Sequence, residues 1–431
     1  MFYVLYNFCL ILIAPFAITY HLYRSYTRKR PAALAERLGI SLPENLHITR
    51  QPRIWVHAVS VGEVLAARPL LAALRIRYPE HALLLTTMTE TGRSVAKTLP
   101  LDGVYYIPFD FWWAVQRFIT AIHPSLVVIM ETELWPNLNH ALAKRSIPLV
   151  LANGRISDES LRGYRRLKWF FKYALSPFSV LCMQTEQDVQ RICAIGAPPD
   201  RTVSAGNLKY DISFAPLPLD EKCRKRAYFG YNENCCIVVA GSTHAGEEEV
   251  VLHAFMADHA EHARLILVPR HPERVASVQE LVRQAGLVPV LRSSLGDHAV
   301  TIAPREVLIV DTVGELMDFY RVSDIAIVGG SIVAHGGHNI LEPISAGVTT
   351  IFGPNMENFR EVSRLAIAYE AGMQVSKEEL AEKIACLVHS PALRQNGSAG
   401  GEKLLVEQGG SVHNHIREIQ TVYPGGTCNG Y

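Results

Sequence analysis

Short runs of apolar, often β-branched residues alternate with longer amphipathic segments along most of the chain. The runs are apolar throughout, which is typical of strands buried on both faces of a parallel sheet. The segments between them are long enough for crossover helices, so the pattern predicts a parallel α/β fold. The predicted strands are residues 54–59, 82–87, 126–130, 149–152 and 180–184, followed by 236–240, 264–268, 307–310, 325–328 and 349–352.

The alternation breaks near Gly206, in a region that contains Pro216 and Pro218, and then resumes. Pro and Gly interrupt regular structure, so this region predicts a boundary between two sheets. A chain of 431 residues, 49% of them hydrophobic, can also bury more than one core. Doubly wound sheets bind ligands at the carboxyl ends of their strands, so we expect the active site in the cleft between two domains. The expected parts are a first domain at 25–210, a linker at 211–226, a second domain at 227–405, and a C-terminal helix and tail at 406–431.

Residues 2–20 form an apolar run without a charged side chain, and a basic cluster follows at residues 24–30. About 20 apolar residues are enough to cross a bilayer as a helix. Because no Lys or Arg precedes the run, we expect an uncleaved single-pass anchor at residues 1–24 that leaves the body of the protein in the cytoplasm. The alternatives are a cleaved signal peptide and an interfacial helix.

The charges of basic and acidic side chains nearly cancel, with 42 Lys and Arg against 41 Asp and Glu. This balance argues against wholesale nucleic-acid binding, so no nucleic-acid partner is expected. The eight cysteines contain no CxxC pair, so neither a disulfide framework nor a zinc site is predicted. Residues 162–173 interleave basic and aromatic side chains; on one helix they would face either an anionic membrane or solvent.

Residues 325–343 are the most informative segment, because they combine a buried strand, a glycine-rich loop and a helix start. This arrangement brings unpaired backbone N–H groups and a positive helix end against an anion such as phosphate. Glu342 could accept hydrogen bonds from a ribose while the backbone of residues 337–339 holds the phosphate. The alternative is an ordinary glycine-linked turn between a strand and a helix.

Other predicted strands of the second domain also end in polar residues. Ser242 could donate to a phosphate, and Arg270 could pair with one. Glu315 offers a carboxylate to a base or ribose, whereas the three glutamates at 247–249 are interpreted as stabilising a first helical turn. Because several strand ends converge, the pattern favours a nucleotide site.

Carboxylates follow two predicted strands of the first domain. Glu63 lies at the start of the helix after the first strand, and Glu131 and Glu133 follow the strand at 126–130. We expect the helix dipole to keep Glu63 ionised at neutral pH, which is the state that a general base requires. The alternative for Glu63 is a carboxylate that caps its helix.

Crowded carboxylates can divide into one ionised member and one that is protonated or neutralised by a cation. Glu131 lies closest to its strand end, so it is the better catalytic candidate of the two acids in that segment. Metal chelation by Glu131 and Glu133 is a weak option, because the chain has no Asp-x-Asp motif to hold a divalent ion against a sugar nucleotide. We expect no metal.

Several of these segments together resemble the 3-deoxy-D-manno-octulosonic acid (Kdo) transferases of Gram-negative bacteria. The matching segments run in order from the apolar run almost to the C-terminus. The resemblance implies a GT-B glycosyltransferase with two Rossmann-like domains around a central cleft. It also implies transfer of Kdo from CMP-Kdo to the lipid A precursor at the inner membrane, without a metal or cofactor. The segments are residues 55–63, Glu-Thr-Glu-Leu-Trp-Pro-Asn at 131–137, 153–157, 206–211, 241–244, 268–274, and Gly-Gly-His-Asn-Ile-Leu-Glu-Pro at 336–343.

By position, the resemblance implies that Glu63 is the catalytic base and Glu131 a second essential acid. It assigns acceptor binding to the first domain and CMP-Kdo binding to the second, while Lys209 and Arg155 match family motifs without a derivable role. The implied CMP-binding residues are Arg270, His271, Val313, Gly314, Glu315, Asn339, Ile340, Leu341 and Glu342, with Ser60, Gly62, Lys209 and Ser242 as possible supporting residues.

Two other functions stay open at this point. One is a membrane-associated GT-B transferase that uses a UDP-sugar, and the other is a nucleotide-sugar sensor without turnover. A dehydrogenase is disfavoured, because no GxGxxG motif follows the first predicted strand.

Overall fold

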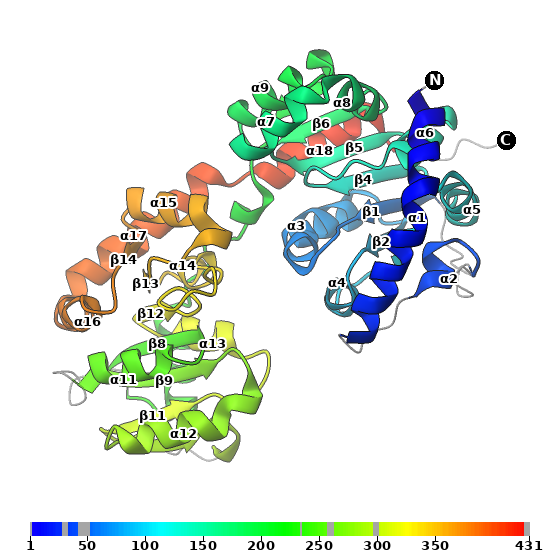
Figure 1. The fold of residues 1–431 in the computed structure, drawn as a ribbon. Helices are drawn as coiled ribbons and strands as arrows, with labels where there is room; N and C mark the ends of the chain where they lie inside the picture. The colour runs from blue at the N-terminus through cyan, green and yellow to red at the C-terminus, as the bar shows by residue number, and fades with distance from the viewer. Residues whose placement is uncertain are drawn as a thin grey trace. The chain divides into compact units, whose positions relative to one another are not determined.

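The computed structural model describes residues 2–27, 33–41, 52–232, 235–256, 263–295 and 301–425. The chain forms two compact units, one made of Met1–Asp211 with Gln408–Tyr431 and the other of Ile212–Glu407 (Figure 1). Each unit contains a seven-stranded sheet in which neighbouring strands run parallel. The predicted parallel α/β fold is therefore confirmed.

The first sheet has the strand order β3-β2-β1-β4-β5-β6-β7. Strands β1 to β3 are added toward one edge of the sheet, whereas β4 to β7 are added toward the other, so the strand order reverses between β1 and β4. Ligands bind in such sheets at the carboxyl ends of the two strands that border this reversal. The strands are β1 (Arg53–His57), β2 (Ala82–Thr87), β3 (Gly103–Tyr106), β4 (Leu126–Met130), β5 (Leu149–Gly154), β6 (Val180–Met183) and β7 (Thr202–Ser204).

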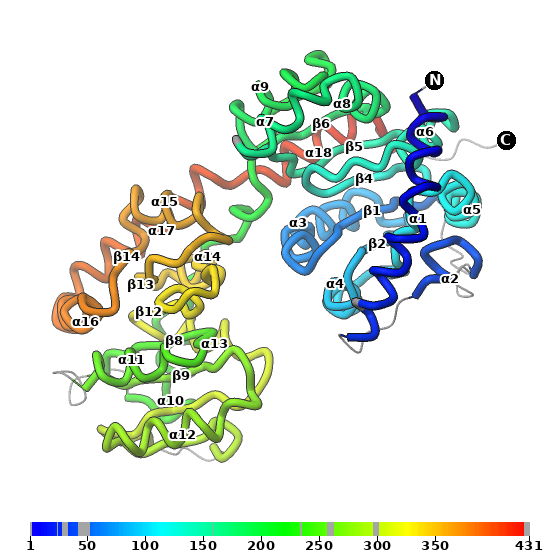
Figure 2. The backbone as a smooth tube through the Cα atoms, in the orientation of Figure 1, coloured from blue at the N-terminus to red at the C-terminus, as the bar shows by residue number. Residues whose placement is uncertain are grey.

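Helices cover both faces of the first sheet. Successive strand residues point to opposite faces, so Trp55 packs on Phe118 of α5 while Val56 packs on the face covered by α3. The last helix of the chain, α18, lies beside β6 and α3 (Figure 2). One face carries α3 (Val61–Arg77), α4 (Glu90–Ala96) and α18 (Ser411–Val422), and the other α5 (Trp112–Ile122), α6 (Pro136–Lys144), α8 (Lys168–Leu175) and α9 (Glu186–Ala194).

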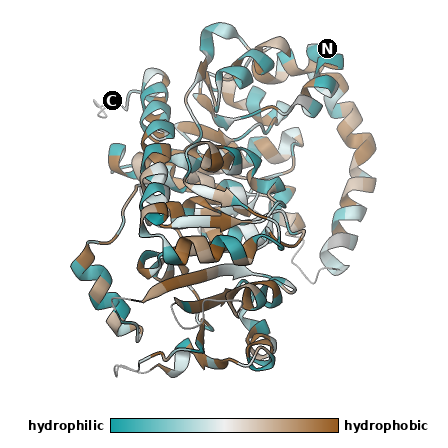
Figure 3. Cartoon of the chain, turned by 90° about the vertical axis from the view of Figure 1, so that its left-hand side faces the viewer, coloured by the Kyte–Doolittle hydropathy of each residue, from teal (hydrophilic) through white to brown (hydrophobic). Residues whose placement is uncertain are grey.

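Helix α1 (Phe2–Thr27) is long and apolar enough to cross a membrane, with a mean hydropathy of 2.0 over its most apolar window. Figure 3 shows hydrophobic residues along its length. Its first turns also contact the first unit: the Tyr6 hydroxyl donates to Asp110 at 2.9 Å, and the Phe2 ring stacks 5.0 Å from that of Tyr173. The short helix α2 (Leu34–Arg37) follows, and residues 28–32 lie outside the described residues.

The second sheet has the order β10-β11-β9-β8-β12-β13-β14. Helices α11, α12 and α16 cover one face, and α13 covers the other with α10 beside it. The strands are β8 (Cys236–Thr243), β9 (Ala263–Pro269), β10 (Val288–Leu291), β11 (Glu306–Ile309), β12 (Ile325–Val328), β13 (Thr349–Phe352) and β14 (Gly372–Gln374). The helices are α10 (Leu219–Tyr228), α11 (Glu247–Met256), α12 (Val275–Gln284), α13 (Leu316–Val322), α14 (Leu341–Ser345), α15 (Arg360–Ala368), α16 (Leu380–His389) and α17 (Pro391–Gln408).

The structure adds four strands that the hydrophobic pattern did not predict. They are β3, β7, β10 and β14, which occupy the two edges of each sheet. Edge strands bury fewer of their residues, so their sequences lack a continuous apolar run. The basic and aromatic segment at 162–173 is also divided, because α7 (Asp158–Arg166) ends before Leu167 and α8 begins after it.

Asp324 ties α10 to the second sheet, and we expect its replacement to destabilise this unit. Its carboxylate accepts from Arg226 at 2.6 Å and from the Ile237 amide at 2.9 Å, and the Arg226 side chain is only 7% exposed. Asp324→Asn should lower the free energy of unfolding by about 3 kcal/mol, because it leaves a buried guanidinium without its charged partner.

Urea denaturation of the purified protein measures this change. Asp220→Asn is the control, since Asp220 pairs with Arg224 on the same helix but both side chains are more than 70% exposed; it should cost less than about 0.5 kcal/mol. Equal effects of the two substitutions would contradict the role given to Asp324.

Candidate functional site

Three acids gather where β1 and β4 end in the first unit, and we call Glu63, Glu131 and Glu133 the acidic edge. The two strands are direct neighbours, with His57 paired to Ile129, so the residues that follow them leave the sheet at the same edge. Glu63 lies in the first turn of α3, and Glu131 directly follows β4. The structure therefore brings together the two acids predicted from the sequence.

Glu63 is buried, with only 9% of its surface exposed. Its carboxylate accepts hydrogen bonds from the Val59 amide at 2.7 Å and from the Ser60 hydroxyl at 3.2 Å. Burial raises the pKa of Glu63 to about 7, although the Val59 amide lowers it, and the charges of Glu131 and Glu133 raise it further. The expectation that the helix dipole keeps this acid ionised at neutral pH is wrong, because loss of solvent outweighs the helix end.

Glu131 has the left-handed backbone conformation, with φ of 54°, which is uncommon for a residue other than glycine. Its carboxylate lies 3.3 Å from the guanidinium of Arg155, which follows β5. The pKa of Glu133 is raised by burial and by the neighbouring charge of Glu131. The acidic edge thus contains one acid beside a cation and two whose environment favours the protonated form.

The buried His57 and the partly buried Trp135 lie next to the acidic edge. His57 is fully buried, and its Nδ1 contacts the Thr86 carbonyl at 3.1 Å and the Thr86 hydroxyl at 2.9 Å. Burial lowers the pKa of His57 to about 3, so the ring is neutral at neutral pH. The His57 ring meets the Trp135 ring edge to face at 5.8 Å. Trp135 is the last residue of the connection between β4 and α6, which also carries Glu131. This contact supports the segment from the sheet side.

The possible supporting residues of the first unit lie at the same edge or close to α18. Ser60 donates to Glu63, as described above, and Gly62 is exposed in the first turn of α3. A side chain at Gly62 would meet only the Ser60 hydroxyl, at 3.8 Å, so packing within the unit does not require glycine there. Lys209 lies in the short 3-10 helix Leu208–Tyr210, where its amide donates to Asn207 at 3.0 Å.

In the second unit, four imidazoles meet at the carboxyl ends of β8, β9 and β12. We call His244, His271, His335 and His338 the histidine cluster. The Nε2 atoms of His244 and His338 lie 2.8 Å apart, and the His244 ring stacks on His335 at 4.2 Å and meets His271 edge to face at 5.7 Å. Only His271 was predicted from the sequence. The sheet brings His244 to the loop that carries His335 and His338, although these segments are about 90 residues apart in the chain.

Two rings of the histidine cluster, His244 and His338, have lowered pKa values. Burial lowers the pKa of His338 to about 4, and the nearby charges of His244 and Arg270 lower it further. The pKa of His244 is also lowered, first by burial and then by His335. An anion placed beside His244 and His338 would oppose the electrostatic part of these shifts, so these two rings can take up protons when one binds.

Arg270 follows β9 and is exposed, with its backbone amide bound to the Thr243 carbonyl at 3.0 Å. Ser242, near the end of β8, has a positive φ of 56°. Both residues therefore lie at the strand ends where the sequence predicted phosphate contacts. In the described part of the chain, no three His, Cys, Asp or Glu side chains are arranged to hold a metal ion; metal independence stays a prediction.

Several backbone amides of the glycine-rich loop after β12 are already bonded within the protein. The amides of residues 330–333 donate to the carboxylate of Glu247, and the Gly337 amide donates to the Gly330 carbonyl at 2.7 Å. The Gly337 amide is therefore not free for a phosphate, whereas the prediction that the backbone of residues 338 and 339 holds one stays a prediction. Glu247 was interpreted as a helix-stabilising acid, and nothing in its local sequence indicates a partner more than 80 residues away.

The end of this loop leads into α14. Asn339 accepts from the Leu341 amide at 3.2 Å and donates to Glu342 at 3.3 Å, so the two polar side chains are coupled. Ile340 and Leu341 are buried and contribute packing. Only Asn339 and Glu342 of this predicted group thus have polar side chains that are partly exposed.

The segment after β11 carries the remaining predicted residues. Val313 is 86% exposed and Gly314 has a φ of 96°, so the backbone turns here in open space. Glu315 precedes α13, and its carboxylate is bound by Arg292 at 3.1 Å and by the Thr312 hydroxyl. A nucleotide contact at Glu315 would therefore share this carboxylate with Arg292.

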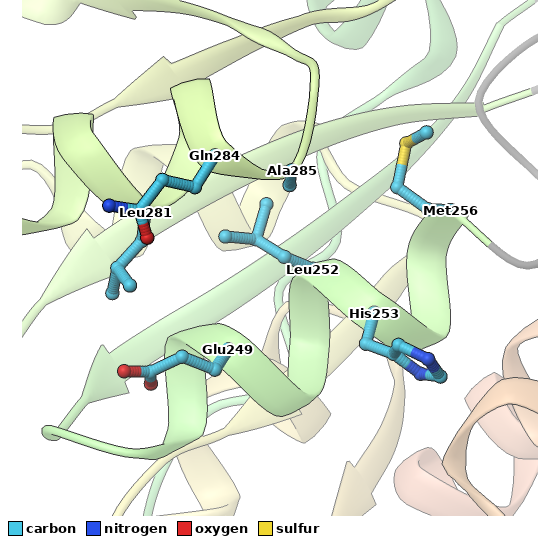
Figure 4. Close-up of a pocket in the computed structure, with 7 residues that line it drawn as sticks. All are labelled: Glu249, Leu252, His253, Met256, Leu281, Gln284 and Ala285. Carbon is cyan, nitrogen blue, oxygen red and sulfur yellow. The ribbon is translucent and has the colours of Figure 1, made fainter.

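A pocket of about 310 Å³ lies between α11 and α12, away from all of these residues (Figure 4). Its lining is mainly apolar and includes Leu252, Met256 and Leu281, with Glu249 at its side. It contains no acid of the acidic edge and no member of the histidine cluster.

Known proteins agree with this architecture. The family model described as 3-deoxy-D-manno-octulosonic-acid transferase (kdotransferase) matches residues 32–212. The 3-deoxy-D-manno-octulosonic acid transferase of Haemophilus influenzae is 36% identical over 385 residues, which cover 87% of this chain and 88% of that protein. The corresponding enzyme of Bordetella pertussis is 33% identical, covering 85% of this chain and 86% of its own length.

Solved structures agree in fold. A glycosyltransferase from Rickettsia africae has a TM-score of 0.55 at 13% identity, with 87% of this chain and 100% of that chain covered. An Anabaena protein crystallised with UDP and glucose has a TM-score of 0.52 at 13% identity, with the same coverage. The chain therefore belongs to the family of 3-deoxy-D-manno-octulosonic acid (Kdo) transferases and has the GT-B glycosyltransferase fold.

Proposed function

We propose that this protein transfers one or more Kdo residues from CMP-Kdo to the tetraacylated lipid A precursor (lipid IVA). Transfer would invert the anomeric centre and need no metal, and it would take place at the cytoplasmic face of the inner membrane. Membership of the Kdo transferase family supports the reaction class. The observation that carries the mechanism is Glu63, a buried acid at a strand end whose pKa is close to neutral.

Glu63 would act as the general base. A base is most effective when its pKa lies near the working pH, because a substantial fraction of it is then unprotonated and that fraction accepts a proton readily. As the acceptor hydroxyl attacks the anomeric carbon, the bond from oxygen to that carbon forms and the hydroxyl proton passes to Glu63. The bond between the anomeric carbon and the phosphate oxygen breaks, and CMP leaves with that electron pair. Glu131, beside Arg155, would stabilise positive charge that develops on the sugar.

The second unit would bind the leaving CMP. Arg270 supplies a permanent positive charge at the end of β9, and the histidine cluster supplies imidazoles that can donate to phosphate or carboxylate oxygens. These groups would meet the charge of the departing phosphate without a divalent ion. Asn339 and Glu342, which are coupled to each other, would contact the ribose.

Helix α1 would hold the enzyme at the membrane that contains its lipid acceptor. Its length and composition permit a bilayer span. Exposed Trp112, Trp113 and Trp169 on the first unit would sit at the level of the lipid headgroups, where aromatic side chains are favoured. We propose a single pass with both units in the cytoplasm; in that state the contacts of Phe2, Tyr6 and Asn7 with the rest of the first unit would be broken, because the first turns of α1 would lie at the far side of the bilayer.

The proposed reaction is tested by mass spectrometry of the glycolipid formed from CMP-Kdo and the tetraacylated lipid A precursor by the purified protein in detergent. We expect a product heavier by one or more Kdo residues. A panel of radiolabelled CMP- and UDP-sugars tests the donor, and CMP-Kdo should be the only productive one. Transfer from a UDP-sugar, or binding of CMP-Kdo without any product, would exclude this function.

Glu63→Gln should lower kcat on the order of 100-fold or more, because the substituted amide cannot accept the hydroxyl proton. The KM for CMP-Kdo should change little, since the donor site lies in the other unit. Steady-state kinetics measure both parameters. Glu80→Gln is the control, because Glu80 is an exposed glutamate beyond the far end of α3. Near-normal turnover of a folded Glu63→Gln protein would refute the role of this acid as base.

The pH dependence of kcat/KM should show the raised pKa of Glu63. The unprotonated fraction of Glu63 increases as pH rises through about 7. We therefore expect kcat/KM to rise about tenfold per pH unit below that value and to level off above it. Glu131→Gln removes a charge that raises this pKa, so the acidic limb should move to lower pH even though the rate falls. An acidic limb near 4.5, or one that Glu131→Gln leaves in place, would contradict this coupling.

A further inference from the structure

Glu247 is a fully buried carboxylate at the start of α11, and it binds backbone amides from two strand ends. One oxygen accepts two of these hydrogen bonds and the other accepts three. The donors are the amides of His244 at 3.0 Å, Gly330 at 2.7 Å, Ser331 at 3.1 Å, Ile332 at 2.9 Å and Val333 at 3.3 Å.

This arrangement is that of an anion bound in a concave stretch of backbone. Consecutive amides that point inward form a site for phosphate or carboxylate, and without an anion they would be buried without acceptors. Here the anion belongs to the protein itself. The conformation of residues 330–333 therefore depends on the charge of one side chain from a neighbouring strand-to-helix connection.

The rest of the loop is built on this anchored segment. Gly329 passes so close to β8 that a Cβ atom there would lie 2.3 Å from the Ser242 carbonyl oxygen. The Gly330 carbonyl accepts from the Gly337 amide, and the His338 ring lies against Gly330. Ser331 in turn accepts from the Gly353 amide at 2.8 Å, which joins the end of β13 to the same segment.

Anchoring of the loop fixes the histidine cluster. His244, whose amide binds Glu247, carries the ring that meets His338 at 2.8 Å, and His338 is adjacent to Asn339. Both partners of this imidazole pair are thus held by the same carboxylate, one directly and one through the loop. Displacing Glu247 would move His338 and Asn339 relative to Arg270.

We propose that Glu247 is a positioning residue for the sugar-nucleotide site. It acts as a built-in anion that shapes the glycine-rich loop, so that His338 and Asn339 face the donor while the loop amides are withheld from its phosphate. The phosphate of the donor is consequently bound by side chains, the histidine cluster and Arg270, and not by the loop amides of residues 330–333. This inference rests on the proposed function, because CMP-Kdo is the donor used to test it.

The test compares three neighbouring glutamates in the full-length protein in detergent. Glu247→Gln keeps the size of the side chain but replaces one acceptor oxygen by a donor. Glu248→Gln matches it for burial, since Glu248 is also fully buried but binds Thr243 and Arg274 and no amide of the loop. Glu249→Gln is the exposed control on the same turn.

For Glu247→Gln we expect the KM for CMP-Kdo to rise on the order of tenfold or more, with a smaller change in kcat, because donor contacts are misplaced before chemistry begins. Hydrogen–deuterium exchange of residues 329–340 should become faster in this variant alone. Glu248→Gln should lower the thermal stability while leaving the KM within about twofold of the unsubstituted protein.

Equal KM values for the three variants would overturn the proposal, even if Glu247→Gln unfolds more easily. If Glu247→Gln does not accumulate in folded form, Glu247→Asp decides: it keeps the charge but withdraws it by one methylene, and an unchanged KM would be equally contradictory. Failure of the proposed function is distinguishable, since the unsubstituted protein would then form no product from CMP-Kdo.

Discussion

Carboxylates buried at the carboxyl ends of parallel strands are the constraint on which both units depend. A carboxylate removed from water must find hydrogen-bond donors, or it takes up a proton. Glu247 has five backbone amides as donors, which makes it an anchor for a loop. Glu63 has one amide and one hydroxyl and lies near two other acids, and its pKa rises to about 7. Burial of a carboxylate is therefore satisfied by backbone hydrogen bonds at Glu247, whereas at Glu63 it raises the pKa.

The interior of each sheet could be predicted from the sequence because burial on both faces leaves a continuous apolar run. Every residue of β4 is buried, and its run at 126–130 was recognised with the same bounds. The edge strand β10 begins with Val288, which is 53% exposed, and includes a proline, so no run marks it. The division of residues 162–173 into two helices was also not visible, because both helices continue the same alternation of basic and aromatic residues.

The candidate site could be predicted only as far as position at a strand end determines it. That rule located Glu63, Glu131 and Arg270, because each lies in the connection that follows a recognisable strand. It could not determine ionisation, since the pKa of Glu63 depends on solvent exclusion and on Glu131 and Glu133, which arrive from another strand. It also could not reveal that His338 meets His244, because only the pairing of β12 with β8 brings these segments together.

The apolar helix and the acidic edge share one buried aspartate. Asp110 accepts from the amides of Asn137 and Leu138 at the start of α6, which begins three residues after Glu133. The Tyr6 hydroxyl of α1 donates to the same carboxylate. Burial raises the pKa of Asp110 to about 7, so removing the charged carboxylate from water is unfavourable even with these three hydrogen-bond donors.

Helix α1 reinforces this connection through a second pair, since Asn7 and Asn137 donate to each other at 2.9 Å. The segment that carries Glu131 and Glu133 is therefore held by β4 at one end and by a helix start that contacts α1 at the other. Loss of α1 would remove the Tyr6 donor from a carboxylate that is already expensive to bury. In this arrangement the apolar helix belongs to the packing of the first unit, and crossing a bilayer would require its first turns to leave Asp110 and Asn137.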